Sequence, residues 1–229
     1  MKEVHFFDLS FDRGVAWYRG HFPTRAYLQF ISSLWGERGL TGEGTPYYLY
    51  HPRAHKRIAD VLPDVKLIAI LRDPVTRLIS HYHHERRLGL EPLSLQDALA
   101  SEDERLVGEE ERILAQPTYR SVSHQHHSYR ARGRYAEQLD RWLSVFPSDQ
   151  ILLVEADRFF KSPSTEFDRV LRFLGLPPQR RTKFRPHNAL RYPPAERQLL
   201  GELNEYYRPY NERLYELVGE DYGWGKTTG

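Results

Sequence analysis

The stretch KLIAILRDPVTRLISHY, residues 66–82, decides the fold of this 229-residue chain. It opens with six mostly apolar residues, a pattern typical of a strand that is covered on both faces of a parallel sheet. Arg-Asp-Pro follows at once, and Pro74 suits the first turn of a helix, where no N–H is needed from it. The stretch therefore predicts a buried strand that ends at Arg72 and passes directly into a helix. Apolar residues continue at helical spacing: Val75, Leu78, Ile79 and Tyr82.

The same alternation of strand and helix extends along the chain. Residues 3–7, Glu-Val-His-Phe-Phe, and residues 151–154 are short apolar runs that predict two further strands. Strands that alternate with helices indicate one α/β domain, residues 1–229, with a mostly parallel sheet. Helical spacing and capping signals predict the helices 12–18, 52–62, 75–86, 94–106, 134–146, 164–175 and 195–218, the last of them broken near Pro209, and residues 26–34 are expected to form another short element.

The composition excludes several classes of protein. The chain has no cysteine, which rules out disulfides, thiolate chemistry and cysteine zinc sites. No apolar run approaches the roughly 18 residues that a transmembrane helix needs, and the first residues do not resemble a signal peptide. We therefore expect a cytoplasmic protein without membrane insertion.

One segment concentrates positive charge although the formal net charge is only +2. Between Arg112 and Glu137 there is no acidic residue. Such a segment favours an anionic ligand, and a solvated basic face explains it equally well. The spacing of its histidines, without a nearby carboxylate, does not favour a metal site. The basic residues of this segment are Arg120, His124, His126, His127, Arg130, Arg132 and Arg134.

Arg72 stands where α/β proteins bind their ligands. Ligands of open α/β sheets lie beyond the carboxyl ends of the strands, where helix amino ends face an anion. A planar guanidinium can hold an oxyanion through two parallel hydrogen bonds. Ser80 lies off the apolar stripe of the predicted helix, so its hydroxyl can reach the same anion. Arg72 is thus either an anion ligand or half of a local ion pair with Asp73 that closes the turn.

These residues carry a resemblance to a known family. RDPVTRLISHY resembles the 3′-phosphate-binding motif of sulfotransferases that use 3′-phosphoadenosine 5′-phosphosulfate (PAPS), most closely the heparan sulfate (glucosaminyl) branch and its bacterial relatives. The resemblance implies a three-layer fold like that of P-loop NTPases, with a central, mostly parallel sheet flanked by helices. Further blocks similar to the family follow in the family's order: KEVHFFD (2–8), GVAWYRGHFP (14–23), GEGTPYYLYHP (42–52), GRYAEQLDRWLSVFP (133–147) and ILLVEADRFFKSP (151–163).

The resemblance implies a role for particular residues. Arg72 and Ser80 match the pair that holds the 3′-phosphate of PAPS. Glu3 matches the catalytic base, and we predict His5 as its catalytic neighbour and Asp8 as a substrate contact. In a strand Glu3 and His5 would point to one face, where a carboxylate beside an imidazole can take a proton from a sugar hydroxyl. Without the family, a surface strand with a satisfied Glu–His contact would be the preferred interpretation.

Two later segments also match the family. The region before GRYAEQL borders the nucleotide and the acceptor groove there, so Arg130 and Arg132 are predicted to bind an anionic acceptor. FRPHNALRYPP, residues 184–194, resembles the loop that closes over the nucleotide, with Arg185 and His187 as candidate contacts to the cofactor. The family needs no metal.

The sequence departs from the family in two places. The family begins with a strand and a phosphate loop of the type Lys-x-Gly-Thr-Thr-Ser, upstream of KEVHFF, and residues 1–229 contain neither. The family's EKTP is EGTP here, with Gly44 in the place of a lysine. We expect either a start placed too late or a truncated relative, and we favour the late start, because losing a central strand would leave strand edges unpaired.

The sequence therefore predicts transfer of a sulfuryl group from PAPS to a hydroxyl or amine of a glycan-like or small-molecule acceptor, impaired in residues 1–229 as they stand. The alternative is a non-catalytic remnant of the fold that binds nucleotide or anionic glycan. RNA binding ranks last, because the sequence contains no recognised RNA motif.

Overall fold

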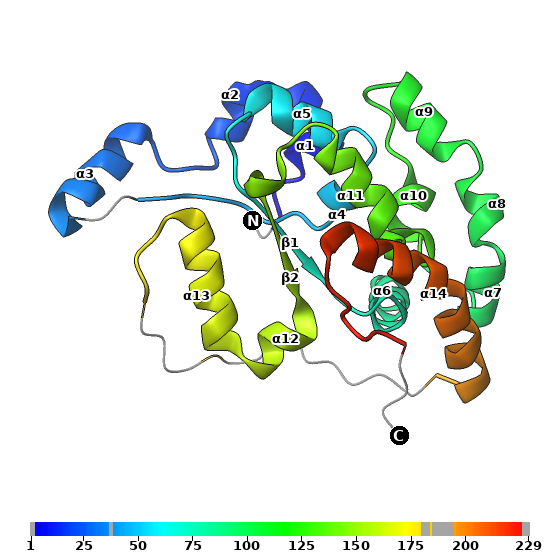
Figure 1. Cartoon of the computed structure of the whole chain (residues 1–229). Helices are drawn as coiled ribbons and strands as arrows, with labels where there is room; N and C mark the ends of the chain where they lie inside the picture. The colour runs from blue at the N-terminus through cyan, green and yellow to red at the C-terminus, as the bar shows by residue number, and fades with distance from the viewer. Residues whose placement is uncertain (1–2, 37–38, 180–183, 185–194, 226–229) are drawn as a thin grey trace.

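The computed structural model describes residues 3–36, 39–179, 184 and 195–225 (Figure 1). Within them two strands, β1 (Leu67–Leu71) and β2 (Ile151–Glu155), pair in parallel. Their register sets Leu67 opposite Ile151 and Leu71 opposite Glu155. The predictions of strands at these two places are confirmed. The chain is thus an α/β protein with a small two-stranded parallel sheet and mostly helices in its described part.

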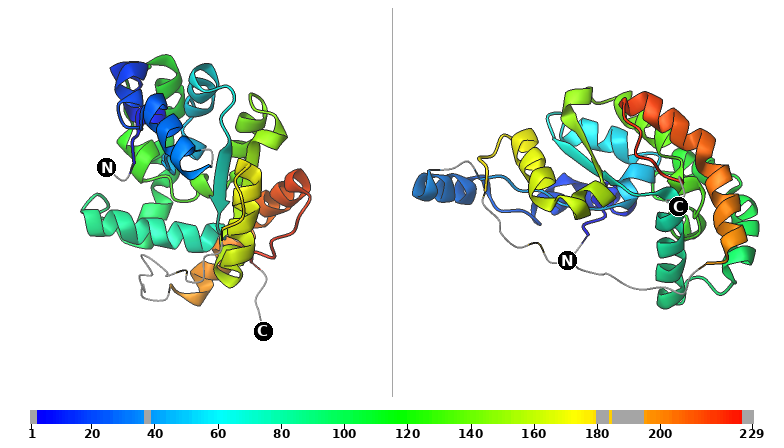
Figure 2. Two further views of the ribbon diagram at one scale, coloured as in Figure 1. Left: turned by 90° about the vertical axis from the view of Figure 1, so that its left-hand side faces the viewer. Right: turned by 60° about the horizontal axis from the view of Figure 1, so that its bottom comes forward.

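Helices make up most of the rest of the described chain (Figures 1 and 2). Those before β1 are α1 (Phe6–Leu9), α2 (Gly14–Arg19), α3 (Arg25–Trp35), α4 (Tyr47–Tyr50) and α5 (Ala54–Val61). Those between the strands are α6 (Pro74–Leu88), α7 (Leu95–Ala100), α8 (Glu102–Leu106), α9 (Glu109–Ala115), α10 (Val122–His126) and α11 (Tyr135–Leu143). Those after β2 are α12 (Ala156–Lys161), α13 (Pro163–Leu174) and α14 (Arg197–Val218), and single 3₁₀ turns lie at Phe11–Arg13, Ala131–Gly133 and Ser148–Gln150.

The passage from β1 into α6 follows from local chemistry. Pro74 occupies the first turn of α6, and the Asp73 carboxylate accepts a hydrogen bond of 2.8 Å from the Thr76 N–H. An aspartate in this position satisfies one of the N–H groups that a helix leaves unpaired at its start. At the other end Gly89 adopts a left-handed conformation with φ 74° and closes the helix. Arg72 is therefore held between the end of a strand and the start of a helix, as predicted.

The core lies on one side of β1 and extends into the helices. Leu71 packs with Tyr135 and Leu139 of α11 and with Leu214 of α14. A second cluster joins α1 to α4, α5 and Trp142, and a third joins α6 to α7 and α14. These clusters fix α1 and α6, the two helices that carry the predicted site residues.

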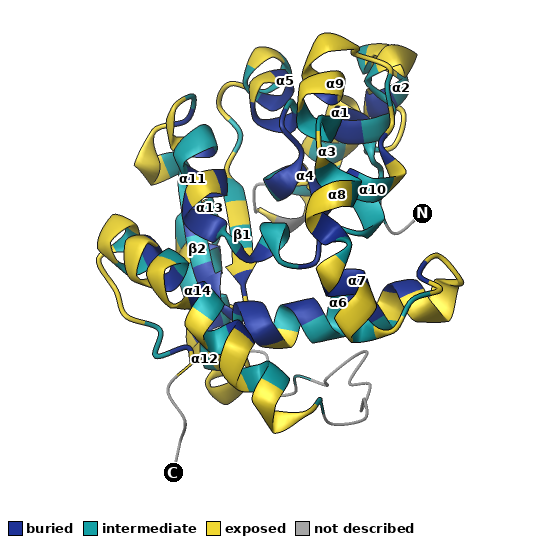
Figure 3. Cartoon of the chain, turned by 90° about the vertical axis from the view of Figure 1, so that its right-hand side faces the viewer, coloured by how far each residue is buried: buried dark blue, intermediate teal, exposed yellow. Residues whose placement is uncertain are grey.

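The opposite side of β1 is open, contrary to the prediction of a strand covered on both faces. Ile68 and Ile70 are 39% and 64% exposed, and the alternation is visible along β1 in Figure 3. The reason is that α12 and α13 pack against β2, and no described element covers the adjoining side of β1.

Residues 3–7 are not a strand, so that prediction is wrong. His5 adopts a left-handed conformation with φ 51° and ψ 38°, and the chain turns there into α1. A strand needs a neighbouring strand to accept and donate its backbone hydrogen bonds, and β1 and β2 are the only strands of the described ranges. The argument that alternating residues share one face of a strand therefore does not apply to Glu3 and His5.

The last predicted helix is not broken at Pro209. α14 runs without interruption through this residue, although proline removes one backbone donor. Tyr207 and Leu214, on either side of Pro209, are fully buried, and this burial holds both halves of α14 on the core. None of the helices in the described ranges is long and apolar enough to cross a bilayer.

Candidate functional site

Three side chains at the start of the chain form a carboxylate–imidazole–carboxylate cluster. The Nε2 atom of His5 lies 3.1 Å from a carboxylate oxygen of Glu3, and its Nδ1 atom lies 2.8 Å from one of Asp8. The Glu3 and His5 side chains are 33% and 28% exposed, whereas that of Asp8 is fully buried. The cluster thus presents Glu3 to solvent and is anchored at Asp8.

The electrostatics of the cluster favour a charged imidazole. The hydrogen bond from His5 to Asp8 raises the pKa of His5, and it outweighs the partial burial that would lower it. The negative charges of Asp8 and Glu3 act in the same direction. His5 can therefore hold a proton between the buried carboxylate and the exposed one, as an acid–base group at a reaction site must.

Tyr48 of α4 fixes the backbone that follows His5. Its hydroxyl accepts hydrogen bonds from the N–H groups of Phe6, at 2.8 Å, and Phe7, at 3.3 Å. The same hydroxyl donates to a carboxylate oxygen of Glu43 at 3.1 Å, and the Thr45 hydroxyl donates to the other at 2.8 Å. Residues of the GEGTPYYLY block therefore hold the backbone at the start of α1 in place through hydrogen bonds.

Arg57 of α5 holds the other end of α1. It is 6% exposed and donates to the carbonyls of Phe7, at 2.8 Å, and Asp8, at 3.1 Å. A further bond of 2.9 Å reaches the carbonyl of Pro117. A buried arginine that neutralises helix-end carbonyls ties α1 to two remote segments, so Asp8 has little freedom to move.

Sequence reasoning did not find Glu43, Tyr48 and Arg57 as supports of the cluster. Tyr48 and Arg57 lie far in sequence from the residues of α1 that they bind, with separations of 42 for Tyr48–Phe6 and 50 for Arg57–Phe7, and Glu43 acts through Tyr48. The one signal was that Glu43 and Tyr48 belong to the quoted block at 42–52, which resembled the family without a role for these two residues.

Arg72 is exposed at the carboxyl end of β1. Within the described part of the chain no ion pair joins it to Asp73, whose carboxylate caps α6 instead. The interpretation of Arg72 and Asp73 as a local ion pair is therefore wrong. The Tyr135 hydroxyl donates to the Arg72 carbonyl at 2.9 Å and fixes this backbone, which leaves the guanidinium available to an anion. Ser80 is half-buried, two helical turns further along α6.

The basic segment is not a free basic face. The Arg130 side chain pairs with Glu102 and, at 3.1 Å, with Asp103. Arg132 stacks on the ring of Tyr47 at 4.8 Å and donates to the Ser128 hydroxyl at 3.0 Å. Acids that precede the segment in sequence thus pair with Arg130, whereas Arg132 is held by an aromatic ring and a hydroxyl. The predicted roles of Arg130 and Arg132 in binding substrate stay predictions, and each would require these arginines to share or leave their present partners.

The histidines of the segment have separate partners. The Nδ1 atom of His124 lies 2.8 Å from the Tyr47 hydroxyl, that of His126 lies 3.1 Å from Glu85, and His127 contacts the Leu90 carbonyl. The described residues contain no group of three side chains suited to hold a metal ion. Arg185 and His187, the candidate contacts of the closing loop, lie outside the described residues.

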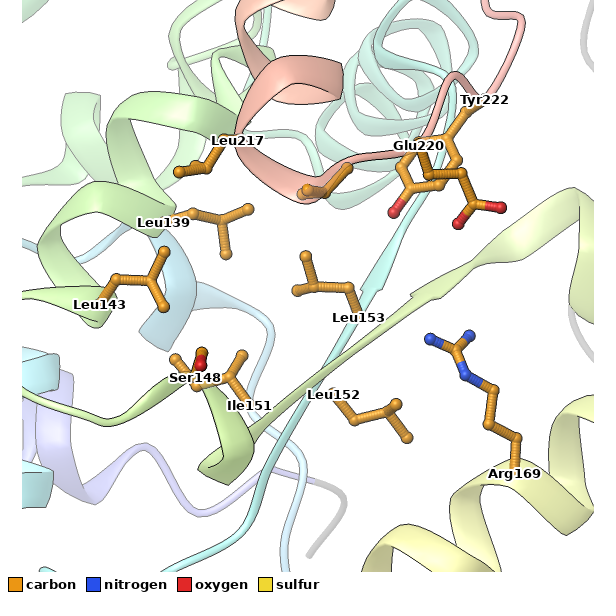
Figure 4. A pocket seen from close by; sticks show the side chains of 11 residues that line it. Leu139, Leu143, Ser148, Ile151, Leu152, Leu153, Arg169, Leu217, Glu220 and Tyr222 are labelled. Carbon is orange, nitrogen blue, oxygen red and sulfur yellow. The ribbon is translucent and has the colours of Figure 1, made fainter.

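A hollow of about 270 Å³ lies along β2, away from the cluster (Figure 4). Leucines of α11, β2 and α14 line it, with Arg169 and Glu220 among its polar groups. None of the predicted site residues takes part in it. It is therefore not the place where the sequence predicts chemistry.

Together the features define a class: an α/β protein with an acid–base cluster at one place and an exposed arginine at the end of a parallel strand. The chain belongs to the sulfotransferase domain family, which matches residues 49–192. This match confirms the resemblance stated above, and it includes Arg72 and Ser80 but not the Glu3–His5–Asp8 cluster.

Individual relatives agree with the family. The chain is 31% identical over 256 residues to human heparan sulfate glucosamine 3-O-sulfotransferase 6, covering 98% of this chain and 65% of that protein. Human heparan sulfate glucosamine 3-O-sulfotransferase 3B1 is also 31% identical, over 97% of this chain and 57% of its own length. A sulfotransferase structure from Alicyclobacillus acidocaldarius matches with a TM-score of 0.67 at 28% identity, covering 99% of this chain and 86% of the other. The chain spans at most 65% of the length of these two human relatives.

Proposed function

We propose that this chain provides the acceptor base and the 3′-phosphate site for transfer of a sulfuryl group from PAPS to a hydroxyl or amine of a glycan-like acceptor. The observation that carries the proposal is the Glu3–His5–Asp8 cluster, open at Glu3 and anchored at Asp8. In-line transfer needs a base that takes the acceptor's proton and a frame that holds this base in place. Glu3 acts as the base. His5 holds the Glu3 carboxylate in position, and the positive charge of its imidazole offsets the negative charge of that carboxylate.

Asp8 fits a positioning role better than a contact with substrate. Its carboxylate is buried and already accepts hydrogen bonds from His5 and, at 2.6 Å, from the Leu9 N–H. In the proposed mechanism it fixes the orientation of the imidazole, as a buried carboxylate does in other acid–base sites.

Arg72 and Ser80 would hold the 3′-phosphate of PAPS, the co-substrate that supplies the sulfuryl group. The fit rests on the exposed Arg72 guanidinium, which makes no ion pair with its neighbour Asp73, at the start of α6. A guanidinium in that place can bind a phosphate through two hydrogen bonds. No metal is needed for these steps.

Nucleotide binding is tested by calorimetry with adenosine 3′,5′-bisphosphate and the chain of residues 1–229. We expect weak binding that falls at least about tenfold in Arg72→Ala, since a charge-assisted phosphate contact is lost. Arg87→Ala, at the far end of α6, is the matched control and should bind as the parent does. Equal binding by all three proteins would refute the assignment of Arg72.

Sulfuryl transfer is tested with labelled PAPS and a heparan-type oligosaccharide. Residues 1–229 contain no Lys-x-Gly-Thr-Thr-Ser loop, so we expect no transfer by this chain and transfer by a chain extended with in-frame upstream residues that encode the loop. Robust transfer by residues 1–229 would show that the loop is not required.

The glycine at position 44, where the resemblance implies a lysine, favours a second candidate, a protein that binds nucleotide or anionic glycan without catalysis. Binding without transfer in both the given and the extended chain would support it. Glu3→Gln separates the two candidates, because it should abolish transfer and leave nucleotide binding unchanged.

A further inference from the structure

Arg132 is a half-buried cation without a carboxylate partner. Among the described residues no acid lies within ion-pair distance of it. Arg130, two positions earlier, pairs with both Glu102 and Asp103. Removing a charge from water is costly unless an opposite charge compensates it. Arg132 therefore differs from Arg130 in that an anion at its guanidinium would meet no competing carboxylate.

The contacts that Arg132 makes leave one of its nitrogens open. Its Nε atom donates to the Ser128 hydroxyl at 3.0 Å, and its Nη2 atom donates to the Gln125 carbonyl. The guanidinium carbon lies 4.8 Å from the centre of the Tyr47 ring and 5.5 Å from that of the Tyr50 ring. No hydrogen bond of Nη1 exists among the described contacts. A ligand can thus bind Nη1 while the two rings keep the guanidinium in place.

The surroundings of Arg132 add a second cation. Burial lowers the pKa of Arg132, and the positive charge of Arg77 acts in the same direction. The charge of Glu85 acts in the opposite direction, but Glu85 already pairs with His81 at 3.3 Å and with His126 at 3.1 Å. An anion bound at Arg132 would therefore be attracted by two arginines.

Arg132 lies on the side of the acid–base cluster. Helix α4, which carries Tyr47, packs against α1, which carries Asp8 (Figure 1). Burial raises the pKa of Tyr47, the charge of Arg132 opposes this rise, and the charge of Asp8 adds to it. The charges of Arg132 and Asp8 thus both act on the hydroxyl of one tyrosine.

The segment around α4 brings no lysine or arginine of its own to this place. Residues 42–52 read GEGTPYYLYHP, with Gly44 where the resemblance implies a lysine. Nothing lies within 4 Å of a Cβ added at Gly44. Arg132 brings a cation to the same helix from a remote part of the chain.

We propose that Arg132 binds an anionic group of the acceptor, a carboxylate or sulfate on a sugar, and supplies the cation that Gly44 does not. The proposal rests on the proposed function, because it names the class of acceptor that the same site takes: a negatively charged glycan. The sulfuryl group of PAPS offers the same chemistry. The acceptor is favoured because Arg132 shares α4 with Tyr48, which supports the cluster that takes the acceptor's proton.

The test is calorimetry of the 229-residue chain with three ligands: a heparan-type oligosaccharide, the same sugar without sulfates and with its carboxyl groups reduced, and adenosine 3′,5′-bisphosphate. We expect the charged sugar to bind and the neutral one to bind at least about tenfold more weakly. Arg132→Gln should weaken binding of the charged sugar at least about tenfold and leave binding of the nucleotide unchanged. Arg132→Lys should bind the charged sugar at least about threefold more weakly, because an ammonium cannot replace a stacked, planar guanidinium.

The matched control is Arg120→Gln, which removes an exposed arginine of the same basic segment. It should bind the charged sugar as the parent does, because a solvated charge is screened by salt. Circular dichroism verifies the fold of each variant. If Arg132→Gln does not fold, Arg132→Lys becomes the decisive variant, and its equality with the parent overturns the proposal.

The other outcomes are distinct. The proposal is overturned if the parent does not bind the charged sugar, if Arg132→Gln binds it equally well, or if Arg120→Gln loses as much. A loss of nucleotide binding alone in Arg132→Gln also overturns it and assigns Arg132 to PAPS. Nucleotide binding that depends on Arg72 would survive each of the first three results, so the failure of this proposal is distinguishable from the failure of the proposed function.

Discussion

Replacing Tyr48 by phenylalanine tests whether its hydroxyl supports the acid–base cluster. Phe6 and Phe7 are 0% and 1% exposed, so water cannot replace the acceptor that their N–H groups lose. Leaving a buried donor unsatisfied costs about 1–3 kcal/mol. The second bond, at 3.3 Å, is longer and counts for less. We therefore expect Tyr48→Phe to lower the free energy of unfolding by roughly 2–4 kcal/mol.

The assay is urea denaturation followed by circular dichroism, with an unchanged slope and a lower midpoint as the expected result. Tyr50→Phe is a matched control: both tyrosines lie in α4 and are 8% exposed, but no side-chain hydrogen bond of Tyr50 exists among the described contacts. This control should cost less than about 0.5 kcal/mol. A second readout is the pKa of His5 by NMR, which should fall towards its ordinary value in Tyr48→Phe because the frame of the Asp8 contact loosens.

Two results would refute this reasoning. One is a Tyr48→Phe protein within about 0.5 kcal/mol of the parent. The other is an equal decrease in the free energy of unfolding in Tyr50→Phe. That result would mean that any loss of a tyrosine hydroxyl from α4 destabilises the protein, whether or not it accepts from the Phe6 and Phe7 N–H groups.

Three further predictions concern other residues. Burial lowers the pKa of His51 to about 3 and of His124 to about 2, so both are neutral when folded, while the unfolded chain takes up their protons near pH 6.5. Stability should therefore fall with decreasing pH below about 6.5, by up to about 1.4 kcal/mol per pH unit for each histidine, and a flat profile of urea midpoints between about pH 6.5 and 5 would contradict this. Arg57→Met removes three hydrogen bonds to carbonyls and should cost about 2–4 kcal/mol in the same assay, whereas its exposed neighbour Lys56→Met should be neutral. Gly44→Lys should leave stability unchanged, because nothing lies within 4 Å of the added Cβ, and calorimetry should show tighter binding of PAPS than in Gly44→Gln.

The parts of the fold that sequence predicted are those set by neighbouring residues. The strand at 67–71 and the helix from Pro74 were found because an apolar run, an N-cap aspartate and a proline act within a few positions. The backbone at residues 3–7 was wrongly predicted to be a strand. A strand forms only beside another strand, and the hydroxyl that accepts from the Phe6 and Phe7 N–H groups belongs to Tyr48, far away in sequence. Distance in sequence also hid the ion pair of Arg130 with Glu102, which lies 28 positions away.

The side chains of Glu3, His5 and Asp8 do lie together although the backbone is not the predicted strand, and their roles at a site stay predictions. Glu3, His5 and Asp8 lie within six positions, so a tight turn brings them together as well as a strand would. What the sequence does not contain is the difference between the two carboxylates. That difference comes from Tyr48 and Arg57, which fix α1 from both ends and bury Asp8.

In the proposed mechanism this difference decides which carboxylate acts on the acceptor. The Asp8 carboxylate is buried and pairs with His5. Breaking this pair would leave an unpaired charge inside the protein, at a cost of several kcal/mol. The Glu3 side chain is 33% exposed, and among the described contacts its carboxylate meets only the outer nitrogen of the His5 imidazole. An incoming hydroxyl can therefore compete with His5 for the Glu3 carboxylate. The raised pKa of His5 keeps a positive charge beside Glu3, and this charge holds the Glu3 carboxylate ionised and in place until an acceptor hydroxyl approaches. Because the charged imidazole has no free nitrogen to accept a proton, the proton taken from the acceptor stays on Glu3 until it passes to solvent, and Glu3→Gln should abolish the proposed transfer.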